Sequence, residues 1–338
     1  MAIDLKPLKA VHRLLFAIPL EPLQGHRFQP TGFPALGAAT YRTKDGDSLL
    51  VESAQSMANR LESTVWDQAL EDVNEVVRGI SHVRITREDK TFLTDTILEA
   101  HRLNSPYLLA NSASPFFTLL QGELGAMEKG PVDRLLLARV LLKYDVGSLL
   151  HGVFFSRPNL AGGRLRIARS LSAFIEADGV QVAASGGVKN DHVDPQGDTN
   201  SGFGNVPFAR DEYTAEKVTL YVNLDLAKIR GFGLGEPVER LLILLALYKL
   251  RAFLESGLRL RTACDLRAKP ESIIAAMPNG FLLPSMDDLC AETAEAIRAS
   301  EGRMVVESVA FVAKPAKTAN KKGTGAGESS EETPGAEE

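Results

Sequence analysis

The sequence has few of the residues from which covalent or metal-based frameworks are built. Only two of its 338 residues are cysteines, Cys264 and Cys290, and neither lies in a CxxC pair. Two separated thiols form neither a disulfide framework nor a structural zinc site. The six histidines are not spaced to share a helix face as metal ligands. We therefore expect a chain that works in a reducing compartment without a cofactor.

Long apolar runs are also missing. The longest, 241–250, is about half a membrane span and contains Lys249. The first ten residues lack the apolar stretch of a signal peptide. We expect a soluble, cytoplasmic protein that does not enter a membrane, and we interpret 241–250 as part of a buried helix.

The chain has no excess of positive charge. Its 38 Lys and Arg residues face 43 Asp and Glu residues, which leaves a net charge of −5. Domains that coat nucleic acid indiscriminately are usually basic. Any nucleic-acid site must therefore be a local groove on an acidic body.

The chain separates into a body, 1–313, and a tail, 314–338. The tail has no aromatic or large apolar residue, and its lysines precede its glutamates. It cannot bury enough surface to offset the entropy lost on ordering, so we predict that it is disordered. We interpret it as a solubilising tail, with docking to a partner as the alternative.

Periodicity predicts the elements of the body. Apolar residues alternate over 218–226 and over 258–267, which is typical of half-buried strands. Between them, Pro237 and Gly257 bracket a helix at 238–255. The first part contains a loop at 24–44 and a helix that begins after Ser53. Further strands are predicted at 12–20 (ended by Pro19 and Pro22), 49–52, 82–86 and 304–312, and further helices at 133–143 and 286–300.

Strand, helix and strand in succession form half of a βαββαβ unit. We predict an α+β protein with a ferredoxin-like core. The second half of the unit is 218–267. We assign the first half to 12–20, the helix after Ser53 and 82–86.

Motifs of catalysis are scarce. The chain has no GxxxxGK[ST], HExxH or GxSxG motif. GFGLG at 231–235 has Glu236 where a dinucleotide fingerprint needs its third glycine, so we interpret it as a flexible turn. A divalent-ion site formed by the acids in 176–198 is one interpretation, but aspartates in such loops more often form Asx turns. They are Glu176, Asp178, Asp191, Asp194 and Asp198.

Two windows, 24–44 and 157–175, contain arginines and no acid. The guanidinium fork binds two phosphate oxygens at once, so a ribose-phosphate chain is a natural ligand. Phenylalanine and tyrosine rings near these arginines, among them Phe154 and Phe155, are able to stack on bases. A solvated basic face is the alternative. The candidate phosphate ligands are Arg27, Arg42, Arg157, Arg164, Arg166 and Arg169.

Two further segments add candidate RNA-binding residues. SAQSMANR at 53–60 places polar groups at a helix start, where an anion can bind or where an ordinary cap suffices. It contributes Gln55, Ser56, Asn59 and Arg60. Lys189 and Asn190 lie in a glycine-flanked loop, and we interpret them as part of a hairpin that wedges between bases. They fall within an acidic stretch that we interpret as an inserted loop from Glu176 onward.

The order of several long segments resembles one protein family. The segments are RLLFAIPLEPLQGHRFQPTGFPALGAATY at 13–41, LLVESAQSMANRLE at 49–62, HGVFFSRPNLAGGRLRIARSLSAFIEADGV at 151–180, SGGVKNDHVDP at 185–195 and GFGNVPFARDEYTAEKVTLYVNLDL at 202–226. Together they resemble the RAMP-superfamily backbone subunit of type I-G (formerly I-U) CRISPR effectors. The resemblance implies an α+β fold with a modified RNA-recognition-motif core, which is ferredoxin-like and carries large insertions. The glycine-rich loop usual near the C-terminus of that family has only GFGLG as a counterpart, and it precedes the long helix.

The resemblance implies a prokaryotic, non-catalytic subunit that polymerises along the spacer of a CRISPR RNA and presents its bases to target DNA. Partners would be the CRISPR RNA, target DNA through the guide, further copies of the chain, a repeat-processing and capping subunit, a large subunit and a recruited helicase-nuclease. Two alternatives stay open. One is a metal-dependent ribonuclease that uses the acids in 176–198, and the other is a scaffold that binds only protein.

Overall fold

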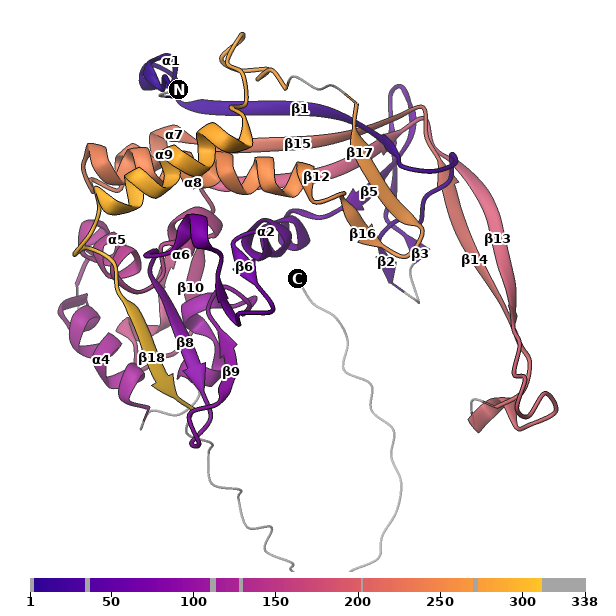
Figure 1. Cartoon of the computed structure of the whole chain (residues 1–338), viewed down its shortest axis with the longest axis horizontal. Helices are drawn as coiled ribbons and strands as arrows, with labels where there is room; N and C mark the ends of the chain where they lie inside the picture. The colour runs from indigo at the N-terminus through magenta and orange to yellow at the C-terminus, as the bar shows by residue number, and fades with distance from the viewer. Residues whose placement is uncertain are drawn as a thin grey trace, which may run out of the picture.

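An antiparallel sheet of seven strands forms the largest layer of the protein (Figure 1). Its strand order is β16-β17-β1-β15-β12-β5-β4. At its centre, β1 (Arg13–Pro22) pairs with β15 (Lys217–Asp225), which pairs in turn with β12 (Leu171–Asp178). The computed structural model describes residues 3–33, 37–109, 114–127, 130–201, 203–269 and 273–311.

The central strands alternate between buried and open positions. In β12 the side chains of Leu171, Ala173, Ile175 and Ala177 are buried. Helices lie beneath this apolar face, with α2 (Ala54–Ser63) packed on β12 and α8 (Glu236–Glu255) packed on α9 (Met286–Arg298) (Figure 1). Burial of one face of each strand explains the period of two in the sequence.

The core has the βαββαβ topology. The strands β1, β12, β15 and β17 (Cys264–Ala268), with α2 and α8 as crossovers, lie in the spatial order 4-1-3-2, and each strand is antiparallel to its neighbours. This arrangement confirms the predicted ferredoxin-like α+β core with insertions. The predicted second half, strand then helix then strand, is also confirmed.

The predicted second strand of the core was wrong. β8 (His82–Thr86) pairs with β18 (Val306–Ala310) and β9 (Phe92–Asp95) in a separate three-stranded sheet. The place in the core belongs to β12. Strand pairing depends on distant partners, and β18 lies more than 200 residues along the chain from β8.

Three smaller predictions also need correction. β1 continues through Pro19, because that residue supplies only its carbonyl, which accepts from the Lys269 amide at 3.0 Å. The predicted strand 258–267 is two strands, β16 (Arg259–Arg261) and β17, which reverse at Ala263 with φ 58°. The predicted loop 24–44 contains β2 (Gly32–Phe33), β3 (Gly37–Ala38) and β4 (Thr40–Thr43), and β4 pairs with β5 (Gly46–Glu52).

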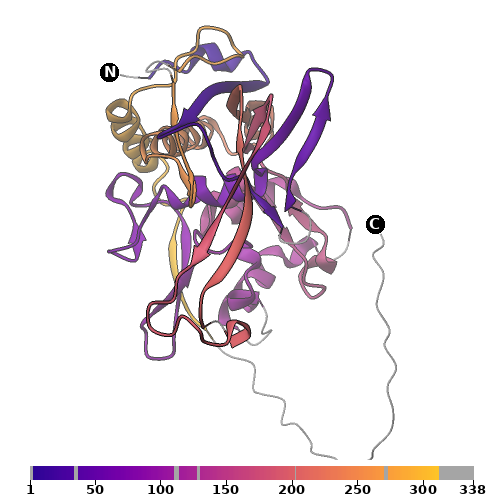
Figure 2. The same cartoon turned by 90° about the vertical axis from the view of Figure 1, so that its right-hand side faces the viewer.

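The stretch after Glu176 is a long hairpin instead of the inserted loop that we expected. The two strands β12 and β15 continue as β13 (Gln181–Lys189) and β14 (Val206–Thr214), which pair with each other over nine positions. Figure 1 shows this hairpin as an arm that extends beyond the body of the protein, and in Figure 2 the same arm lies in front of the body. The pairing satisfies the backbone amides that an isolated loop would leave to solvent.

The largest insertion, 64–170, lies between α2 and β12. In chain order it contains β6 (Trp66–Asp67), β7 (Asp72–Val73), η1 (Glu75–Val77), β8, β9, η2 (Arg102–Asn104), α3 (Pro106–Leu109), α4 (Pro115–Leu124), η3 (Gly125–Met127), α5 (Arg134–Tyr144), α6 (Gly147–His151), β10 (Val153–Phe155), η4 (Ala161–Gly163) and β11 (Leu165–Ile167). The predicted helices 133–143 and 286–300 correspond to α5 and α9.

Two further predictions concern the C-terminal tail and the membrane. The predicted disordered tail, 314–338, lies outside the described residues. Within the described part, none of the helices is both long enough and apolar enough to cross a bilayer. The short helix α1 (Lys6–Lys9) precedes β1, and α7 (Leu226–Gly231) follows β15 directly.

Candidate nucleic-acid interface

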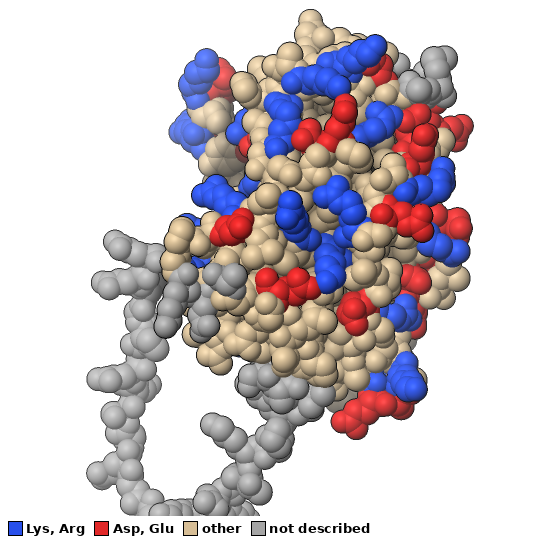
Figure 3. Space-filling view, turned by 90° about the vertical axis from the view of Figure 1, so that its left-hand side faces the viewer, with Lys and Arg blue, Asp and Glu red and all other residues tan. Residues whose placement is uncertain are grey.

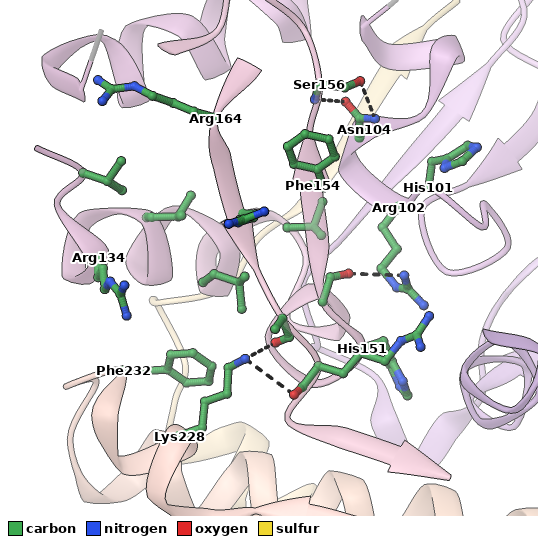
Figure 4. Close-up of a pocket in the computed structure, with 18 of the residues that line it drawn as sticks. His101, Arg102, Asn104, Arg134, His151, Phe154, Ser156, Arg164, Lys228 and Phe232 are labelled. Atoms are coloured by element: carbon green, nitrogen blue, oxygen red, sulfur yellow. Dashed lines mark hydrogen bonds between the residues drawn. The ribbon is translucent and has the colours of Figure 1, made fainter. Parts of the chain in front are cut away.

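A pocket of about 1250 Å³ lies where the large insertion meets the core (Figure 4). Its walls come from η2, α5, the β10–β11 hairpin, the segment after β11 and α7. Six of the lining residues are Lys or Arg, and among the described residues none of the lining side chains is acidic. The six are Arg102, Arg134, Arg164, Arg166, Arg169 and Lys228.

The lack of acid is a property of the pocket and not of the whole surface. On the face shown in Figure 3, basic and acidic side chains are interspersed. The chain as a whole carries a net charge of −5. A concave surface lined by one sign of charge concentrates the electrostatic potential and attracts ligands of opposite charge. The pocket is therefore suited to an anionic ligand.

The β10–β11 hairpin places a ring beside a guanidinium. Phe154 and Arg166 are cross-strand partners, so their side chains lie on the same face of the hairpin. The Phe154 ring is 51% exposed, whereas the adjacent Phe155 is buried in the core. Of these two neighbouring rings, both among those that the sequence suggested for base stacking, the structure presents only Phe154 to the pocket.

Lys228 connects α7 to the end of β11. Its Nζ donates to the carbonyl oxygens of Ala168 and Arg169, the latter at 3.5 Å (Figure 4). Burial lowers the pKa of Lys228, Asp225 opposes this shift, and Arg134 adds to it. The charges of Lys228 and Arg134 therefore act on the same part of the pocket. Sequence reasoning missed both, because neither lies in an acid-free window.

Arg102 is held rigidly at another wall. It is only 4% exposed, and its Nε donates to Glu62 Oε1 at 2.6 Å while Nη2 donates to Oε2. Its Nη1 donates to the Gly152 carbonyl at 3.2 Å. Burial raises the pKa of Glu62 to about 6, although Arg102 opposes this shift. The pair fixes the guanidinium in place.

A second buried pair lies beside Arg102. Lys249 of α8 is 2% exposed, and its Nζ lies 3.0 Å from Nε2 of His151, which is 1% exposed. Burial lowers the pKa of Lys249 to about 8, and burial lowers the pKa of His151 well below its ordinary value. Burial raises the pKa of the nearby Asp145, although its hydrogen bond from Ser148 opposes this shift. His151 is therefore neutral at pH 7.

The pocket brings together four of the predicted RNA-binding residues, Gln55, Arg164, Arg166 and Arg169. Arg166 is exposed on β11. Arg164 donates to the Ala161 and Met127 carbonyls at 3.1 and 2.8 Å. Arg169 donates to the Gln55 amide oxygen, and its pKa is lowered by burial and by Arg102.

Two predicted residues at the start of α2 are engaged elsewhere. The Ser56 hydroxyl donates to Glu52, and its amide donates to Ser53 Oγ at 3.2 Å. Arg60 donates to Glu52 Oε1 at 3.1 Å and to the Leu260 carbonyl. This geometry favours the ordinary helix cap over an anion site at this helix start.

The remaining predicted residues lie outside the pocket. Arg27 and Arg42 approach Glu212 and Asp47 at 3.5 and 3.6 Å, and Arg42 is 84% exposed on the edge strand β4. Asn59 is exposed on α2, and Arg157 is half-buried just after β10. Lys189 ends β13 and Asn190 follows it, at the outer end of the arm.

The acids in 176–198 do not converge. Glu176 and Asp178 lie on β12, whereas Asp191 accepts the amides of Val193, Asp194 and Gly204 at the end of the arm. These backbone hydrogen bonds lower the pKa of Asp191. Across the described residues, no three His, Cys, Asp or Glu side chains are grouped to hold a metal ion. The geometry matches the Asx-turn interpretation.

The glycines of GFGLG lie between two helices rather than between a strand and a helix. Gly231 ends α7, and Gly235 adopts φ 87° as the N-cap of α8. Gly231 and Phe232 also line the pocket. The segment is a turn, as predicted, and it contributes to the pocket wall.

One protein family and several solved structures are similar to this chain. The chain belongs to the CRISPR-associated protein GSU0053 family (Cas_GSU0053), whose model matches residues 14–182, half of the chain. No curated protein matches the chain.

Two solved structures are similar over most of the chain. A chain of a "CRISPR RNA-guided surveillance complex, pre-nicking" is 15% identical with a TM-score of 0.39, and the match covers 77% of this chain and 74% of that one. Csc2 of Thermofilum pendens is 9% identical with a TM-score of 0.32, and the match covers 89% and 78%. Both TM-scores lie below 0.5, so neither likeness defines the role of this chain.

Proposed function

We propose that this chain is a non-catalytic, RNA-binding backbone subunit of a CRISPR effector of type I-G. It binds the phosphates of a guide RNA in the basic pocket and repeats along the spacer as further copies of itself. Family membership supports the CRISPR context. The observation that carries the RNA-binding role is the pocket, in which six Lys and Arg side chains meet no acid among the described lining residues.

The remaining parts of the proposal follow from this role. The guide pairs with target DNA, so base pairing reads sequence while the protein holds the backbone. The assembly contains a repeat-processing and capping subunit and a large subunit, and it recruits a helicase-nuclease. The site of action is the prokaryotic cytoplasm. Gln55, Arg164, Arg166 and Arg169 are the predicted residues best placed to contact RNA, and the pocket adds Arg134 and Lys228 as candidates.

Arg166→Ala tests the pocket directly. For single strands, log Kobs changes with log salt concentration with a slope of about −0.7 for each phosphate neutralised. We expect weaker RNA binding and a slope reduced by about 0.7, measured by fluorescence anisotropy. Arg78→Ala is the matched control, because Arg78 is exposed and pairs with Glu75 outside the pocket. Equal salt slopes for the two variants would show that Arg166 does not contact an RNA phosphate.

Co-expression with a CRISPR array and the partner subunits tests the CRISPR role. We expect the purified assembly to contain array-derived guides when its small RNA is sequenced. Random cellular RNA would refute the guide assignment, and an absorbance ratio of pure protein would favour the scaffold that binds only protein. Magnesium-dependent RNA cutting that Asp191→Ala abolishes would favour the ribonuclease.

A further inference from the structure

The pocket wall contains one polar atom that the protein leaves without a partner. His151 lines the pocket and is 1% exposed, and Nδ1 of its ring has no hydrogen-bond partner among the described residues. Buried polar groups are almost always hydrogen-bonded, because an unsatisfied one costs about 1–3 kcal/mol. The unpaired Nδ1 therefore indicates a hydrogen-bond partner that belongs to a bound ligand.

Lys249 determines which hydrogen bond that ring nitrogen makes. The ammonium group of Lys249 has only hydrogens to offer, so at 3.0 Å it donates to Nε2 of His151. In a neutral imidazole that accepts at Nε2, the hydrogen resides on Nδ1. Nδ1 is therefore a donor, and its missing partner is an acceptor.

The surroundings of His151 select an acceptor with negative charge. The charges of Lys249, Arg102 and Arg169 all act on the His151 ring. Arg102 is neutralised by Glu62, but no carboxylate of the described residues lies within ion-pair distance of Arg169, whose partner is the neutral amide of Gln55. Arg169 is half-buried, and a partly desolvated cation without a carboxylate partner favours an anion beside it.

We propose that His151 Nδ1–H and the Arg169 guanidinium bind one non-bridging phosphate oxygen of the RNA, and that Lys249 is the positioning residue that keeps the hydrogen on Nδ1. The inference rests on the proposed RNA-binding function and deepens it. The Nδ1–H of His151 is an uncharged donor, so its contribution to RNA binding can be separated from the electrostatic attraction of the arginines. Figure 4 shows Arg102 and His151 at the same end of the pocket.

A pair of substitutions at His151 isolates the donor. His151→Asn and His151→Phe both remove the Nε2 acceptor of Lys249, but only the asparagine amide keeps an N–H near the position of Nδ1. With a labelled single-stranded RNA of mixed sequence, we expect His151→Phe to bind about tenfold more weakly than His151→Asn, as one charge-assisted hydrogen bond predicts. Equal affinities of the two variants would overturn the proposal.

The salt dependence separates the two members of the site. Because His151 is neutral, both His151 variants keep the wild-type slope of log Kd against log salt. Arg169→Ala reduces that slope by about 0.7, since it removes one charge. A reduced slope for His151→Phe would show a charged imidazolium and contradict the inference. Wild-type protein that binds no RNA would refute the proposed function itself, which the wild-type titration alone reveals.

A spectroscopic measurement tests the tautomer of His151 in the protein before RNA is added. In ¹⁵N-histidine-labelled full-length protein at pH 7, the His151 ring should show a protonated Nδ1 and an unprotonated Nε2. The signal is identified by its absence in His151→Phe, and Lys249→Met should release the preference for one tautomer. Added RNA should shift the Nδ1 signal. A protonated Nε2 in the free protein, or an unmoved Nδ1 signal in protein that binds RNA, would disprove the arrangement.

Discussion

The buried Lys249 gives the protein an unusual dependence of stability on pH. Burial lowers the pKa of its ammonium group from 10.5 to about 8. Between these values the unfolded chain binds a proton at this site that the folded chain has released. Stability therefore rises with pH in that window. The sign is opposite to that of a lysine whose folded pKa is raised by a carboxylate.

The magnitude follows from the shift. One pKa unit corresponds to about 1.4 kcal/mol, so the displaced pKa of Lys249 reduces stability by about 3 kcal/mol at pH 7 and by about 1 kcal/mol at pH 9.5. We expect the wild-type protein to gain about 2 kcal/mol relative to Lys249→Met between these two pH values. Urea unfolding of the RNA-free proteins at both pH values measures this difference, and groups that titrate in both proteins cancel from it.

Lys143 offers a matched control on α5. Its pKa is raised by the hydrogen bonds to Glu123 and Tyr144, so its contribution to stability is lost as pH rises through the folded pKa. That loss occurs above the ordinary pKa of 10.5, so between pH 7 and pH 9.5 Lys143→Met should leave the pH profile nearly parallel to that of the wild-type protein, unlike Lys249→Met. Parallel profiles for the wild-type protein and Lys249→Met would refute a charged, desolvated lysine at this position.

Two further predictions concern the pocket walls. Glu62→Gln should lower the free energy of unfolding by about 3–5 kcal/mol, because it leaves the buried Arg102 without a counter-ion; the exposed Glu75→Gln should change it by less than about 1 kcal/mol in the same urea titration. Phe154→Ala should weaken RNA binding by about 1–3 kcal/mol for one stacked base without changing the salt slope, and an unchanged Kd would contradict stacking. The neighbouring Phe155→Ala should instead destabilise the fold by about 3–5 kcal/mol, since its ring is buried.

Local patterns in the sequence predicted local structure well. The alternation over 218–226 corresponds to β15, and Pro237 and Gly257 bracket α8 as expected. The second strand of the core could not be found in the same way, because β8 and β12 are both short strands with buried residues. Only the pairing of β12 with β15, and of β8 with the distant β18, separates their roles.

The candidate site was predictable only where its residues are close in sequence. Arg164, Arg166 and Arg169 lie in one acid-free window of the sequence. They also share one wall of the pocket, because β11 and the segment after it form that wall. Arg102, Arg134 and Lys228 reach the same pocket from η2, α5 and α7. No pattern in the sequence relates these three positions, because the distances between them depend on how the insertion packs on the core.

The sequence alone determined the strongly periodic elements, among them β15 and α8, and showed that arginines gather in windows without acid. Only the tertiary structure decided which of the arginines line the pocket and which are paired with a carboxylate. Glu52 binds Arg60 and Arg261, and Glu62 binds Arg102, although these partners lie 8 to 209 residues apart. Electrostatic pairing falls off with distance in space, and sequence windows report only neighbours along the chain.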